Sequence, residues 1–282
     1  MSILDVWQEV EKNMADLSKT MNLFKHAFDR FHNYGLKALC LASLLAFAAS
    51  SCFAKEKMNE DTKAYVESNL LGILYHELGH AIIHLKEVPI FGQEEDAADV
   101  FSVLLIDQLH EEQDAQDIAY DAAFGYIEDP EGNGEVHYWD VHGPDEQRYY
   151  NHICLFVGAN PKERNQLAID LELPEERLEY CPEEFDQAYA SWGAVLDELE
   201  VGAPANTIVL QKTGGVPSEH FKLLLEIVEQ EIALLNQDFA LPKPLKVNVS
   251  KCDEANAFYD PQEVSVTMCV EFVQHLIDRM PE

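Results

Sequence analysis

The sequence has few basic residues for its length. Its 282 residues include 19 Lys and Arg against 52 Asp and Glu, which gives a formal net charge of −33. Such a surface repels the phosphate backbone of nucleic acids and anionic membranes, so we expect no nucleic-acid partner. The same charge keeps a protein soluble, and it attracts basic substrates and divalent cations.

Other features are missing as well, and each absence narrows the class of protein. No long Gly/Ser-rich or Pro-rich linker, internal repeat or low-complexity tract occurs, so nothing forces a division into several globular domains. None of the six cysteines forms a Cys-x-x-Cys pair, which argues against a cysteine-ligated zinc site. Hydrophobic residues make up 47% of the chain, enough to bury a core.

The N-terminal part has the layout of an export signal. A basic stretch that begins at Met21 precedes an apolar run that ends in small residues. This order predicts a signal peptide within an N-terminal extension of residues 1–54, and therefore a periplasmic or secreted protein. Two alternatives remain open: residues 38–54 form an uncleaved membrane anchor, or Cys52 carries a lipid. Met21 is also an alternative start of the chain.

Export changes the expected state of the cysteines. Four of them, Cys154, Cys181, Cys252 and Cys269, follow the predicted signal. An even number in an oxidising compartment indicates disulfides, and four cysteines allow three pairings. We favour Cys154–Cys181 and Cys252–Cys269 because each pair closes a short loop.

A long helix is predicted around the segment YHELGHAIIH, residues 75–84. Apolar residues recur at helical spacing before and through this segment. Asp61 or Thr62 is the expected capping residue, and Pro89 marks the end.

This helix carries two histidines and a glutamate in the pattern HExxH. His76 and His80 are four residues apart, so both imidazoles project from one face and can bind a single ion. Glu77 lies about 100° round the helix, beside the pair, where its carboxylate can handle protons without being a ligand. Burying these groups in an apolar segment would be costly without a metal, so the pattern predicts a metal site.

A catalytic zinc has three protein ligands, so a third must come from elsewhere. A metzincin would have His at position 86 and Gly at 83, but Lys86 and Ile83 stand there. His84 is an alternative ligand, although its side chain projects away from the helix face that carries His76 and His80.

A second helix is predicted in FGQEEDAADVFSVLLIDQL, residues 91–109. Glu95 and Asp99 lie four apart on one face of it, and this ExxxD spacing resembles that of the gluzincins. The resemblance implies that Glu95 binds the metal and that Asp99 orients a ligand imidazole from behind. Glu94 and Asp96 point elsewhere and are interpreted as solvated capping charges.

Together, HExxH and ExxxD resemble a zincin of the gluzincin type. The segments VHYWDVHGPDEQRYYNHICLFVGANP and CDEANAFYDPQEVSVTMCVEF are also similar to a bacterial family of metallopeptidases of unknown function, so the likeness covers most of residues 60–275. It implies a hydrolase with one Zn²⁺, a peptide or protein substrate, and Glu77 as general base.

Hydrolysis also needs a donor to the oxyanion that develops on the substrate. Gly143 and Pro144 read as the entry to a helix, and His142 beside them is the first candidate, followed by Tyr149 and Arg148. Structural alternatives stay open, because His142 suits a turn cap, Arg148 a pair with Asp145, and Tyr149 the core.

The rest of the chain predicts an α+β, zincin-like fold. Helical periodicity covers 181–200 and 217–239, while 206–212, 245–252 and 263–272 read as strands. Zincins usually place a sheet before the active helix, and too little chain precedes it here. We therefore expect the C-terminal strands to complete a small sheet whose edge holds an extended peptide.

Residues 55–282 are thus predicted to form one metallopeptidase domain. Two other functions remain: a non-hydrolysing relative that keeps zinc for stability and binds a partner in the cell envelope, and an amidase of cell-wall peptides. The intact Glu77 favours hydrolysis, because a structural zinc needs no general base.

Overall fold

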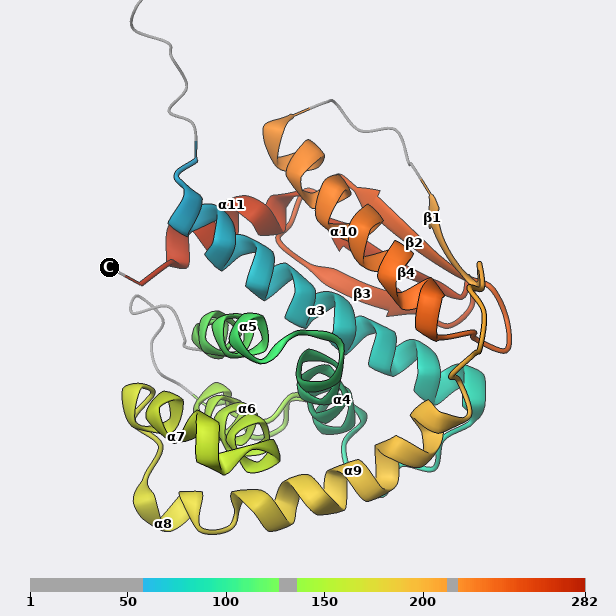
Figure 1. Cartoon of the computed structure of the whole chain (residues 1–282). Coiled ribbons are helices and arrows are strands. Elements are labelled where there is room, and N and C mark those ends of the chain that lie inside the picture. The colour runs from blue at the N-terminus through green and yellow to red at the C-terminus, as the bar shows by residue number, and fades with distance from the viewer. Residues whose placement is uncertain (1–57, 127–135, 212–217, 282) are drawn as a thin grey trace, which may run out of the picture. The chain divides into compact units, whose positions relative to one another are not determined.

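The computed structural model describes residues 58–126, 136–211 and 218–281 (Figure 1). The predicted extension of residues 1–54, with its signal, anchor and lipidation alternatives, lies outside these ranges and stays a prediction. Within them, every helix is too short or too polar to cross a membrane.

A 27-residue helix, α3 (Glu60–Lys86), carries the HExxH motif. Asn59 caps it, because its Oδ1 accepts a hydrogen bond of 2.6 Å from the backbone N–H of Thr62. The expected cap at Asp61 or Thr62 was therefore two to three residues late, since Asn59 begins the same polar run. Glu87 ends the helix in a left-handed conformation with φ of 54°.

Helices cover one side of α3, as Figure 1 shows. They are α4 (Glu94–Leu109), α5 (Glu112–Phe124), α6 (Asp145–Ala159), α7 (Pro161–Asp170), α8 (Glu175–Leu178) and α9 (Cys181–Asp197). Helices α4 and α5 pack directly on α3, and α6 packs on both of them. Helix α9 closes this layer, where the ring of Trp192 lies 4.7 Å from that of Phe101 in α4.

A four-stranded mixed sheet lies on the other side of α3 (Figure 1). Its strands are β1 (Ile208–Gln211), β2 (Leu245–Ser250), β3 (Ala257–Asp260) and β4 (Ser265–Cys269), in the order β1-β2-β4-β3. The first three in that order are parallel, and β3 runs antiparallel to β4 at one edge. The predicted α+β fold, with a sheet made by C-terminal strands, is confirmed.

Two details of the sheet differ from the sequence-based expectation. Strand β3 was not predicted, because its four residues are too few for a clear alternation. The strand expected over 263–272 ends at Cys269, and Glu271 begins α11 (Glu271–Arg279), which packs against α3. Helix α10 (Glu219–Asp238) connects β1 to β2 and contacts both the sheet and α3.

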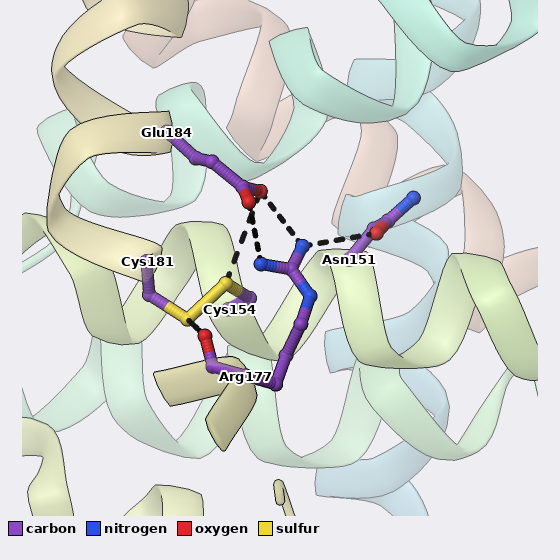
Figure 2. Close-up of a disulfide and its surroundings, with 5 residues drawn as sticks. All are labelled: Asn151, Cys154, Arg177, Cys181 and Glu184. Carbon is purple, nitrogen blue, oxygen red and sulfur yellow. Dashed lines mark hydrogen bonds and ion pairs between the residues drawn. A yellow bond between two sulfur atoms is a disulfide. The ribbon is translucent and has the colours of Figure 1, made fainter. Parts of the chain in front are cut away.

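Both predicted disulfides form. Cys252–Cys269 joins the end of β2 to the end of β4, and Cys154–Cys181 joins α6 to the start of α9. Figure 2 shows the second bond beside Arg177, which donates hydrogen bonds of 2.6 and 2.7 Å to the carboxylate of Glu184. Helix α9 is thereby fixed against α6.

Candidate metal centre

Three ligand atoms converge where α3 meets the start of α4. Oε2 of Glu95 lies 3.2 Å from Nε2 of His76 and 3.1 Å from Nε2 of His80. The two imidazole nitrogens are 3.1 Å apart. Tetrahedral ligands bound to zinc at 2.0–2.1 Å are separated by about 3.3 Å. The three residues therefore fit a single tetrahedral ion.

A close helix crossing brings Glu95 within reach of the histidines. A Cβ atom on Gly79 would lie 3.1 Å from Cα of Ala98 and 3.3 Å from Cδ1 of Phe101. Because glycine has no Cβ, α4 approaches α3 more closely at this point than any larger residue allows. The small residue inside HELGH thus positions the third ligand.

A carboxylate behind His76 fixes the orientation of its ring. Oδ1 of Asp99 lies 2.8 Å from Nδ1 of His76, so the Nε2 atom points toward Glu95. Asp99 is held in turn by Arg148, which donates hydrogen bonds of 2.7 and 2.9 Å. The hydroxyl of Tyr126 also donates to Asp99, at 3.4 Å. Burial opposes ionisation of Asp99, but Arg148 and His76 outweigh it and lower its pKa.

His80 has a carboxylate of its own behind it. Oε1 of Glu94 lies 2.8 Å from its Nδ1. Glu94 is an exposed acidic residue in the first turn of α4, as expected, and it also supports His80, which was not expected. The sequence could have indicated this role, because each of two ligand imidazoles needs a hydrogen-bond acceptor and Asp99 supplies only one.

Glu77 lies beside the three ligands and is buried. Burial raises the pKa of its carboxyl group, because the charged form loses its hydration. The backbone N–H of Tyr259 in β3 donates a hydrogen bond to it and moderates this shift. A buried carboxyl group held in this way is suited to accept and release a proton.

His142 reaches the rim of the same centre from the loop before α6. Its Nε2 lies 3.1 Å from Oε2 of Glu95, and its Nδ1 lies 3.3 Å from Oδ1 of Asp140. Its backbone N–H also donates to Asp140, so it caps a turn as well. The hydrogen bond with Glu95 raises the pKa of its imidazole. Its half-exposed side chain faces the cleft described below.

The two other candidate oxyanion donors, Arg148 and Tyr149, form hydrogen bonds with other groups. Arg148 forms the bidentate pair with Asp99, so it supports a ligand, and its distance from Asp145 is 3.9 Å. Tyr149 donates its hydroxyl to the carbonyl of Leu171 at 2.9 Å and packs against the core, away from the metal centre. Adjacent residues of a helix point about 100° apart, so α6 cannot aim both at one site.

His84 is not placed as a ligand. Its Nδ1 lies 2.7 Å from the hydroxyl of Tyr259, so it connects α3 to β3. Sequence reasoning gave no role to Tyr259, because nothing local links a C-terminal strand to the active helix.

An open cleft of about 810 Å³ exposes the metal centre. Helix α3 forms its floor, and the start of α4 and strand β3 form its sides. The residues that line it include His76, Glu77, His80, Glu95, His142, Ala257, Phe258 and Tyr259. The centre can therefore be reached by a chain lying along β3.

Comparison with known proteins assigns the chain to a family. A search of curated proteins and a search of solved structures found no match. One family model matches residues 3–196 and 220–282, which is most of the chain and includes every residue of the metal centre described above. The chain therefore belongs to the family described as "Putative metallopeptidase".

Proposed function

We propose that the protein is an exported, zinc-dependent peptidase that hydrolyses peptide bonds. The observation that carries this proposal is the convergence of His76, His80 and Glu95 beside the buried carboxyl group of Glu77. The site lies on a helix flanked by an antiparallel edge strand, which also favours a zincin-like architecture.

A zinc ion held by His76, His80 and Glu95 would act as a Lewis acid, which lowers the pKa of bound water to about 7 and polarises the carbonyl group of the substrate. Glu77 accepts the proton of the attacking water at its carboxylate and later delivers it to the leaving amine. Burial raises the pKa of Glu77, which favours this role, and the hydrogen bond from Tyr259 holds its carboxyl group in place. Asp99 and Glu94 keep the two imidazoles in the orientation that binding requires.

His142 is the proposed donor to the substrate oxygen. Negative charge develops on that oxygen during attack, and a preorganised N–H lowers its energy. Asp140 holds Nδ1 of His142, which leaves Nε2 directed at the metal centre. In the metal-free protein, the hydrogen bond with Glu95 raises the pKa of His142, and Asp140 supports the same ring from its other nitrogen.

The substrate is proposed to bind in extended form along β3. In the described part of the chain this strand pairs with β4 on one side only. Its other edge borders the cleft, so its backbone groups can pair with a peptide. Export is proposed from the N-terminal signal pattern and from two disulfides, which persist in oxidising compartments.

Glu77→Gln tests the proposal, with Glu67→Gln on the same helix as the control. Glu67 lies outside the cleft. We expect the wild type and Glu67→Gln to cleave members of a mixed peptide library and to hold one zinc each by elemental analysis. Glu77→Gln should hold zinc and lose at least a thousandfold in rate.

Two outcomes would contradict a peptidase. A zinc-loaded wild type that cleaves none of the library favours the binding-protein alternative. Cleavage confined to cell-wall peptides in the same library favours the amidase.

A further inference from the structure

A second cavity, of about 230 Å³, opens beside Glu77 and runs along α3 toward its N-terminal end. Ile73, Asn69 and Tyr65 follow Glu77 along this stripe of the helix, three or four residues apart. The opposite walls come from the end of α5, from α6 and from α11, and include Phe124, Tyr126, His152, Phe272 and Leu276. Aromatic and aliphatic side chains form one part of its surface, and polar side chains such as Asn69, Asp99 and Arg148 form the rest.

Two buried residues that line this cavity each carry a side-chain polar atom without a hydrogen-bond partner. Among the described residues, only two buried side-chain polar atoms lack a hydrogen-bond partner: the hydroxyl of Tyr65 and Nδ1 of His152. Both residues line this one cavity, and both are more than nine-tenths buried. A buried polar atom without a partner costs free energy, so a ligand that supplies the partner gains affinity.

The hydrogen bond made by Nε2 of His152 determines which kind of partner its Nδ1 needs. Nε2 lies 3.0 Å from the carbonyl oxygen of Ala119 and must donate to it. Nδ1 of the neutral ring is then an acceptor. Burial lowers the pKa of His152 to about 4, so the ring stays neutral near pH 7. Its partner must be a hydrogen-bond donor.

Charges around the cavity disfavour ionised side chains. The guanidinium groups of Arg148 and Arg279 line it, and the carboxylate of Asp99 that also lines it is already paired with Arg148, so a lysine or arginine of the substrate would meet two cations and no unpaired carboxylate beyond the entrance. Glu77 at the entrance and the lone pair of His152 would repel a carboxylate. The remaining choice is a neutral side chain that has an apolar body and a donor at its tip.

We propose that this cavity is a specificity pocket that receives a tyrosine side chain of the substrate, with the phenol O–H donating to Nδ1 of His152. An apolar cavity of about 150 Å³ holds a benzene molecule, so this one has room for a phenol ring. Phe124, Tyr126 and Phe272 offer the aromatic edges and faces that such a ring prefers. That the ligand of this pocket is a peptide substrate rests on the proposed function. Binding of a tyrosine side chain to the pocket can be tested without any peptidase activity.

The test compares two ligands and two variants. Binding of N-acetyl-tyrosine amide and N-acetyl-phenylalanine amide is measured by calorimetry or NMR titration, both without metal and in zinc-loaded Glu77→Gln. We expect the tyrosine ligand to bind about tenfold more tightly, because only it supplies the donor.

His152→Gln keeps a donor for Ala119 and removes the acceptor at the position of Nδ1, so the preference should disappear. His152→Asn keeps an acceptor at that position, so the preference should remain. His110→Gln, outside the cavity, is the control for stability, and melting curves establish that each variant is folded. If His152→Gln is unfolded, Ile73→Phe replaces it, because it narrows the entrance and should weaken both ligands.

The outcomes separate this inference from the proposed function. Equal binding of the two ligands, no binding of either, or a tyrosine preference that survives in His152→Gln overturns the pocket assignment. The peptidase function is then tested by mapping the cleavage sites in a denatured protein. Cleavage without enrichment of tyrosine at the cleavage sites contradicts the pocket assignment but not the peptidase function. Selective tyrosine binding without any cleavage supports the pocket and contradicts the peptidase.

Discussion

Gly79 of α3 packs closely against Ala98 of α4, between the two helices that form the candidate metal centre. A Cβ atom on residue 79 would lie 3.1 Å from Cα of Ala98. Glu95 lies less than one turn before Ala98, so the separation of the helices here sets the distance from Glu95 to the two histidines.

Replacing Gly79 by valine should weaken zinc binding. The added atoms push α4 outward, which moves Glu95 away from His76 and His80, and overpacking costs about 1–3 kcal/mol. We expect at least a tenfold loss of zinc affinity in a competition titration with a chelator. Gly72→Ala is the matched control, because a Cβ there meets Cβ of Ala122 at an ordinary 3.5 Å. Equal zinc affinity in the two variants would contradict this role of Gly79.

Asp99→Asn should lower zinc affinity although Asp99 is not a ligand. The amide holds the ring of His76 less firmly and leaves the guanidinium of Arg148 without its carboxylate. Loss of such a partner typically costs 10–100-fold in metal affinity. Glu94→Gln should cost less, because Glu94 is half exposed to solvent. The same titration measures both, and a larger effect at Glu94 would reverse the assignment.

The disulfide Cys154–Cys181 should stabilise the helical layer. It closes a loop with a sequence separation of 27 residues. The chain-entropy estimate for a loop of that size is about 3.5 kcal/mol. The double variant with serine at both positions should lose stability of this order in urea unfolding. Glu184→Gln breaks only a partly exposed ion pair beside the bond and should cost roughly 1 kcal/mol or less. A double variant as stable as the wild type would contradict the prediction.

Acid should destabilise the metal-free protein partly through His152. Its pKa falls from 6.5 to about 4 in the folded state because burial disfavours the charged ring. Above pH 6.5 both states are neutral and the stability is intact. Between pH 6.5 and 4 the unfolded state binds a proton that the folded state does not, so stability falls by up to ~3 kcal/mol. His152→Gln should flatten this part of the pH profile in urea unfolding. A profile unchanged by the substitution would contradict it.

The candidate metal ligands on α3 followed from local sequence, because helical periodicity fixes which residues share a face. His76 and His80 are four apart, and the structure places their Nε2 atoms 3.1 Å apart. Spacing also put Glu95 and Asp99 on one face of α4, and their contacts with His76 agree with the roles that the gluzincin resemblance implied.

Other parts of the site could not be read in this way. Arg148 and Tyr149 were equivalent candidates, since only the packing of α6 decides which neighbour faces Asp99. The contact of Glu94 with His80 was not expected because His80 belongs to another helix. Tyr259 stayed unnoticed because strand β3 is short and joins the centre from nearly 180 residues away in sequence.

The sequence by itself determined the two helices that carry the HExxH and ExxxD faces and favoured the observed pairing of the cysteines, because each depends on residues close together in the chain. The tertiary structure alone decided which carboxylates support the histidines, how β3 reaches Glu77, and where a cavity with two unpartnered polar atoms opens. These features depend on contacts between distant segments. Their geometry is set by the packing of whole helices and strands, such as the close crossing at Gly79, and local patterns do not encode it.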